Sequence, residues 1–306
     1  MARMAIIAAV LRVAVLSLVS LLLACAQAPP YSPDLGKLEP LQQGGSELSV
    51  AEAENRAPTP DLLALTDEMR DFVDRYVLTA RLPRQRLHML HSSLRSSALL
   101  GIDYDPEADG TAAQAFERGV ANCLTYAHLF VSMARYAGLD ARYQTLTLRP
   151  QWIRYGTRVA LRQHVNVLVR LRRNETYMVD IVPVQRKSVA GTRLLADADA
   201  FALHHSNLAM MLLRRDQVGG AYAHAIKAVK LSRATDYLWV NLGVIYNRAG
   251  QAEAAERSYL TAIELNPNSR SAMNNLMVLH TRNGKPERAA FWEQQVAEHR
   301  QRNPYY

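Results

Sequence analysis

One cysteine of the sequence stands where a buried helix is expected to begin. Apolar residues recur at helical spacing from Leu124 to Gly138, and Cys123 directly precedes them. The free amide groups and the positive dipole end of a helix favour a thiolate over a thiol. The position indicates a nucleophile, although a lone cysteine on a helix is more often an inert core residue.

A histidine and an aspartate follow on predicted strands between residues 159 and 182. His164 lies on the first of these strands and Asp180 on the next. A hairpin centred at Arg172 places Asp180 directly opposite His164, whereas a turn centred on Asn174 offsets them. The sequence leaves this register open, and either arrangement brings the two side chains within reach of each other.

These three residue types suit acyl transfer at a thiolate. In this interpretation Cys123 attacks a carbonyl carbon, and its backbone amide helps to hold the oxyanion. His164 pairs with the thiolate and then protonates the leaving amine, while Asp180 fixes the imidazole tautomer. Hydrolysis and transfer to an amine pass through the same thioester, so these residues do not distinguish the two outcomes.

The stretch 119–142, together with the segments around His164 and Asp180, resembles the core of the transglutaminase-like superfamily of papain-fold cysteine enzymes. The resemblance implies an α+β papain-like domain with a cysteine on a helix, followed by an antiparallel sheet that carries the histidine and the aspartate. It implies Cys123, His164 and Asp180 as the catalytic triad. Asn122 departs from the family, in which glycine often stands shortly before the cysteine.

Other histidines give weaker signals. His128 lies five residues after Cys123, which rotates it by roughly 140° around the helix, so we interpret it as structural. The adjacent His204 and His205 lack the spaced cysteine or carboxylate partners of a zinc site. We therefore expect no metal and no cofactor.

The first residues predict export. Arg3 and Arg12 accompany an apolar run over 13–24, which is typical of a secretory signal peptide. The run ends in Leu-Leu-Ala before Cys25, and this resembles the lipobox of bacterial lipoproteins; an uncleaved membrane anchor is the alternative. The resemblance implies a signal peptide over 1–24, a lipid on Cys25 and a periplasm-facing outer-membrane lipoprotein. Nucleic acid is then not an expected partner.

The carboxy-terminal part repeats with a period of 34 residues. Asn207, Asn241 and Asn275 align at this offset. The central copy resembles a tetratricopeptide repeat at Trp239, Leu242, Gly243, Tyr246, Ala255, Tyr259, Ala262 and Pro267. Three such repeats, over about 202–303, predict a small helical array that docks a protein client or packs on the preceding domain as a scaffold.

Composition and spacing together predict the domain organisation. The 306 residues are 49% hydrophobic with a net charge of +8, which excludes a wholly disordered chain, and two cysteines exclude a disulfide framework. We expect a flexible, proline-rich tether over 25–60, a transglutaminase-like domain over 61–198 and an all-α tetratricopeptide repeat domain over 199–306.

The predicted function is that of a cysteine peptidase or amidase acting on a peptide or protein substrate. The alternative is a catalytically inactive transglutaminase-like adaptor that binds proteins through its repeats. A reactive Cys123 distinguishes the two hypotheses.

Overall fold

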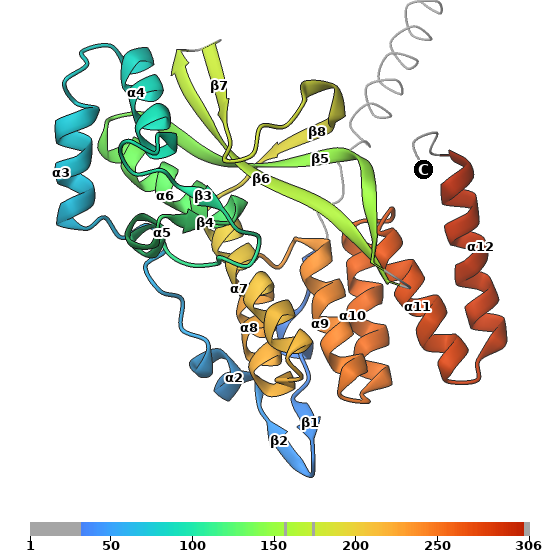
Figure 1. The fold of residues 1–306 in the computed structure, drawn as a ribbon. Helices are drawn as coiled ribbons and strands as arrows, with labels where there is room; N and C mark the ends of the chain where they lie inside the picture. Colours follow the sequence, from blue (N-terminus) through green and yellow to red (C-terminus); the bar gives the residue numbers. More distant parts are fainter. Residues whose placement is uncertain (1–31, 156–157, 173–174, 303–306) are drawn as a thin grey trace, which may run out of the picture. The chain divides into compact units, whose positions relative to one another are not determined.

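The computed structural model describes residues 32–155, 158–172 and 175–302 (Figure 1). The described residues from 33 onward form one compact unit. The helices are α2 (Val50–Arg56), α3 (Asp67–Tyr76), α4 (Pro83–Arg95), α5 (Ala112–Arg118), α6 (Cys123–Tyr136), α7 (Asp197–Arg214), α8 (Val218–Leu231), α9 (Asp236–Arg248), α10 (Ala252–Leu265), α11 (Arg270–Arg282) and α12 (Pro286–Arg302), with short 3-10 turns at Leu35–Lys37 and Arg186–Ser188. The strands are β1 (Leu41–Gln43), β2 (Ser46–Leu48), β3 (Asp103–Tyr104), β4 (Val120–Ala121), β5 (Asp140–Tyr155), β6 (Arg158–Arg172), β7 (Glu175–Val179) and β8 (Val189–Leu194).

The first domain is α+β, as predicted. Helix α6 is its central element, because every residue over 124–134 is buried and the helix packs against β5 and β6. The Asn122 side chain caps its start, and Gly138 follows its end with a φ of 78°, a conformation that favours glycine. Strands β5 to β8 form an antiparallel sheet in the order β7-β6-β5-β8.

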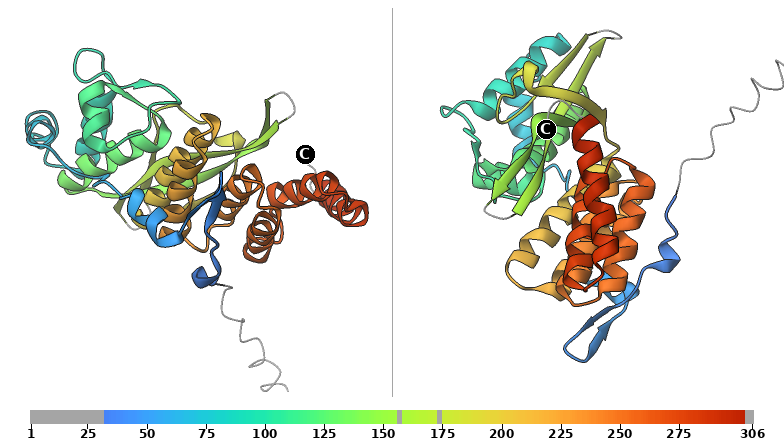
Figure 2. Two further views of the ribbon diagram at one scale, coloured as in Figure 1. Left: turned by 90° about the horizontal axis from the view of Figure 1, so that it is seen from below. Right: turned by 90° about the vertical axis from the view of Figure 1, so that its right-hand side faces the viewer.

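The second part is an all-α array of three helix pairs, which the 34-residue period predicts. The pairs α7/α8, α9/α10 and α11/α12 follow one another in chain order (Figure 2). Gly243 allows the central pair to approach closely, since a Cβ there would lie 2.5 Å from the Tyr259 ring. The small residue in this signature position therefore has the packing role that the repeat pattern predicts.

Helix α7 belongs to both cores. It begins at Asp197, two residues before the expected domain boundary. Ala200 and Leu203 pack in the core of the α+β domain, whereas Ala209 packs in the core of the array. Arg135 of α6 also forms two hydrogen bonds with Asp197, at 2.6 and 2.8 Å. The array is thus joined to the first domain through a shared helix rather than through a loose linker.

Part of the expected flexible tether has a defined structure, which corrects that prediction. Strands β1 and β2 pair around Gly44 and Gly45, whose φ angles of 58° and 79° suit a two-residue hairpin turn. Leu41 is only 1% exposed and joins the core of the array. The hydroxyls of Tyr222 and Tyr246 both donate to the carbonyl of Glu39 at 2.5 Å. The two glycines form the turn of a folded segment that packs on the repeats.

The expected signal peptide over 1–24 and Cys25 lie outside the described residues. Within 32–155, 158–172 and 175–302, no helix is both long and apolar enough to cross a membrane.

Candidate active site

Cys123 is the first residue of α6, so it lies at the amino-terminal end of the helix, as the sequence predicts. The Oδ1 atom of Asn122 accepts a hydrogen bond from the amide of Thr125 at 2.8 Å, and this cap fixes where the helix begins. The thiol is half-buried against the core of the α+β domain. At this helix end, amide groups without intrahelical acceptors favour an anion.

His164 and Asp180 meet on neighbouring strands. The His164 Nε2 atom and the Asp180 Oδ2 atom form a short hydrogen bond, and the two side chains are only 14% and 11% exposed. The other oxygen of Asp180 accepts a bond from the amide of Val182 at 3.1 Å. Arg95 of α4 donates to the carbonyl of Ile181 at 2.7 Å and so fixes the segment that carries the carboxylate.

The register that brings them together lies between the two that the sequence left open. Strands β6 and β7 pair Val167 with Val179. Continued by one residue, this ladder puts Asp180 across from Asn166, so His164 is its diagonal neighbour on the same face. Side chains in diagonal positions remain within reach of each other.

Cys123 lies close enough to His164 to raise the pKa of the imidazole. Because Nε2 is bonded to Asp180, Nδ1 is the ring nitrogen left for the thiol. Burial alone lowers the pKa of His164, but the hydrogen bond to Asp180 and the nearby Cys123 outweigh it and raise the pKa to about 9. The imidazole therefore keeps its proton at neutral pH, as an ion pair with a thiolate requires.

A family model supports the resemblance that the sequence suggested. The model described as the transglutaminase-like superfamily matches residues 70–244, more than half of the chain. The chain belongs to the transglutaminase-like superfamily. The match includes Cys123, His164 and Asp180, and it continues past β8 through α7 and α8 into α9.

Solved structures similar to this transglutaminase-like chain match it over about a third of its length. The crystal structure of MamA is 18% identical with a TM-score of 0.33, and the match covers 34% of this chain and 61% of MamA. The second TPR of Spaghetti (RPAP3), bound to an HSP90 peptide, is 19% identical with a TM-score of 0.30 and coverages of 31% and 89%. The Arabidopsis OM64 TPR domain is 13% identical with a TM-score of 0.32 and coverages of 34% and 86%.

The chain thus spans about three fifths of the length of MamA. No curated protein matches its sequence.

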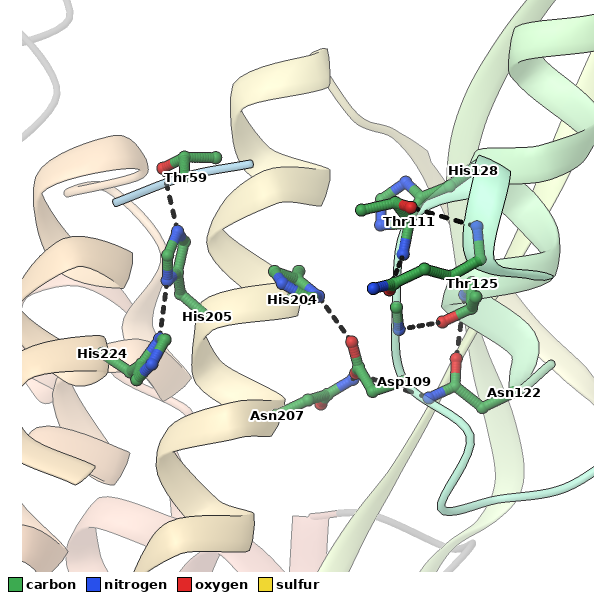
Figure 3. Close-up of polar contacts among 12 residues, drawn as sticks. Thr59, Asp109, Thr111, Asn122, Thr125, His128, His204, His205, Asn207 and His224 are labelled. Atoms are coloured by element: carbon green, nitrogen blue, oxygen red, sulfur yellow. Dashed lines mark hydrogen bonds and ion pairs between the residues drawn. The ribbon is translucent and has the colours of Figure 1, made fainter. Parts of the chain in front are cut away.

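Buried histidines of the transglutaminase-like chain lie around α7 (Figure 3). His128, interpreted from the sequence as structural, is fully buried and bonds to the Tyr143 hydroxyl at 2.7 Å; burial lowers its pKa to about 3. His205 contacts His224 and Thr59, each at 2.9 Å, and burial lowers its pKa to about 3 as well. Both rings are therefore neutral at physiological pH.

His204 points the other way, toward Asp109, a residue that no motif of the sequence indicates. The two residues are 95 positions apart, so no local pattern could reveal the pair. Across the part of the chain that the structure describes, no group of three or more histidine, cysteine or carboxylate residues could hold a metal ion. The rings of His128, His204, His205 and His224 contact one another in sequence, and His128, His204 and His205 form the hydrogen bonds given above.

Proposed function

We propose that this protein is a cysteine-dependent acyl-transfer enzyme that acts on amide bonds of peptides or proteins, as a peptidase or amidase rather than a cross-linking transferase. One observation carries the proposal: His164 is hydrogen-bonded to Asp180 and lies close enough to Cys123, at the start of a buried helix, for the thiol to raise its pKa. Membership of the transglutaminase-like superfamily supports it.

The reaction proceeds in two steps. The Cys123 sulfur attacks the carbonyl carbon, a C–S bond forms, and the backbone amide of Cys123 helps to hold the oxyanion. His164 gives its proton to the leaving amine as the C–N bond breaks, while Asp180 keeps the imidazole oriented. Water then loses a proton to His164 and attacks the thioester, which releases the carboxylic acid and restores the thiolate. This route needs no metal or cofactor.

Alkylation of Cys123 by iodoacetamide tests the proposal. An ordinary thiol has a pKa of about 8.5 and reacts slowly at pH 6. We expect Cys123 to react at pH 6 nearly as fast as at pH 8, because His164 keeps its proton up to about pH 9 and pairs with the thiolate. His164→Ala should slow the reaction at pH 6 by about 100-fold, since only about 0.3% of an ordinary thiol is then ionised.

The exposed His88 on α4 provides a matched control, and His88→Ala should leave the alkylation profile unchanged. A profile with its midpoint near about 8.5 that is insensitive to His164→Ala would support the inactive adaptor instead.

The array is proposed to dock the protein client. Tandem helix pairs form extended surfaces suited to peptides and proteins, and the shared helix α7 connects this surface to the domain that carries Cys123.

We further propose that Cys25 carries a lipid that anchors the protein in the bacterial envelope, facing the periplasm. The apolar run and the Leu-Leu-Ala before Cys25 motivate this assignment. Metabolic labelling with a fatty-acid analogue should mark the wild-type chain, and Cys25→Ser should lose the label and remain unprocessed or soluble. A label that persists in Cys25→Ser would refute lipidation at this residue.

A further inference from the structure

The loop 108–110, which we call the brace loop, contacts the chain on both sides of Cys123. The carbonyl of Ala108 accepts a hydrogen bond from the amide of Asn122 at 3.0 Å. The amide of Gly110 donates to the hydroxyl of Thr125 at 3.0 Å. The brace loop is therefore hydrogen-bonded to the residue before Cys123 and to the first turn of α6 after it.

The middle residue of the brace loop, Asp109, is bound from two directions. Its side chain is 10% exposed and accepts from His204 Nδ1 at 2.5 Å and from Asn207 Nδ2 at 3.1 Å, both on α7. The Nδ2 atom of Asn122 donates at 3.4 Å to Asp109 Oδ2, the oxygen that also accepts from Asn207 (Figure 3). Asn122 is the residue whose Oδ1 atom caps α6.

This carboxylate is ionised despite its burial. Desolvation alone raises the pKa of Asp109, but the hydrogen bonds from His204 and Asn207 outweigh that effect and leave the pKa below its ordinary value. A buried carboxylate that receives several donors is held firmly, because losing a partner leaves an uncompensated charge.

We propose that Asp109 is a positioning residue for Cys123 and that α7, the first helix of the array, sets it through His204 and Asn207. The inference rests on the proposed function, because it assigns a role relative to a reactive thiol. It makes the array part of the machinery that holds the nucleophile against His164.

Alkylation rates of Asp109→Asn across pH 5 to 9 test this inference in the full chain. If Asp109 positions the cap of α6, this variant should react about 10 to 100 times more slowly than the wild type at pH 7, the loss expected when a reacting atom is displaced by about 1 Å. If Asp109 acts only as a nearby negative charge, its removal favours the thiolate and the reaction becomes faster at low pH. The direction of the change therefore decides between the two roles.

Variants of His204 separate positioning from general stability. Asparagine can present an amide donor near the place of Nδ1, so His204→Asn should keep the Cys123 alkylation rate within about threefold of the wild type. Leucine has no donor, so His204→Leu should slow alkylation as much as Asp109→Asn does. The matched control is Glu107→Gln, which removes an exposed ion pair between the residue directly before the brace loop and Arg214 of α7. Glu107→Gln should leave the alkylation rate of Cys123 unchanged.

Hydrogen exchange over residues 122–126 gives a readout that does not depend on reactivity. Protection of these amides should fall in Asp109→Asn and stay intact in Glu107→Gln. Slow alkylation of the wild-type thiol at pH 6 would refute the proposed function. Reduced protection in Asp109→Asn would even then support the role of Asp109 and the brace loop in positioning the start of α6. Unchanged protection and an unchanged alkylation profile in Asp109→Asn would overturn the inference, even if the melting temperature falls.

Discussion

Replacing Trp239 with alanine is expected to lower the free energy of unfolding by about 3 to 5 kcal/mol, because it removes a large buried aromatic side chain. Trp239 on α9 is 5% exposed, and its Nε1 atom donates to the carbonyl of Arg233 at 2.8 Å. The loss is expected to unfold the central repeat. Urea denaturation followed by circular dichroism measures it.

Phe291 is the matched control, since it is an aromatic residue of the same array that is 53% exposed. Phe291→Ala should change the unfolding free energy by less than about 1 kcal/mol. Equal effects of the two substitutions would contradict the packing role that the repeat pattern assigns to Trp239.

The same variant tests how far damage spreads along the array. Repeats contact mainly their neighbours, so loss of α9 and α10 need not unfold α7 and α8. We expect Trp239→Ala to lose capture of envelope proteins while Cys123 alkylation survives, since α7 retains His204 and Asn207 against Asp109. If Trp239→Ala loses both Cys123 alkylation and capture of envelope proteins, the whole array is structural support for the catalytic domain. The hypothesis that the array docks a client independently would then be wrong.

Periodic features of this chain could be predicted from the sequence. The helical spacing before Gly138 predicts α6, and the 34-residue period predicts three helix pairs, because each pattern repeats within a short window. The candidate site could also be predicted, because a cysteine at a helix start and two polar residues on neighbouring strands are local features. In the structure His164 is hydrogen-bonded to Asp180 and lies near Cys123, as this chemistry requires.

Long-range contacts could not be predicted in the same way. Composition over 25–60 predicts a tether, yet the carbonyl of Glu39 meets Tyr222 and Tyr246, which lie 183 and 207 residues further along the chain. Asp109 likewise looks like an ordinary turn residue until α7 brings His204 to it. Such pairings depend on tertiary packing, which no local spacing encodes.

The register between β6 and β7 could not be predicted from the sequence. Turn composition around Asn174 allowed more than one hairpin centre, and each centre shifts the residue opposite Asp180. The observed ladder makes Asp180 the diagonal neighbour of His164. Only the packing of the whole sheet selects that pairing.

Formation of an acyl-enzyme on Cys123 is the decisive test of whether this thiol is a nucleophile assisted by His164. The purified chain is mixed with a small activated ester, such as p-nitrophenyl acetate, at pH 6 to 7, and peptide mapping by mass spectrometry locates the acetyl group. In samples quenched with acid during the first turnover, we expect one acetyl group per chain, on Cys123, which hydroxylamine removes. Acetylation at position 123 should be absent in Cys123→Ser and about 10²-fold slower in His164→Ala. Acetylation confined to lysine residues, or acetylation of Cys123 that is equally fast in His164→Ala, would show that Cys123 and His164 do not form an acyl-transfer site.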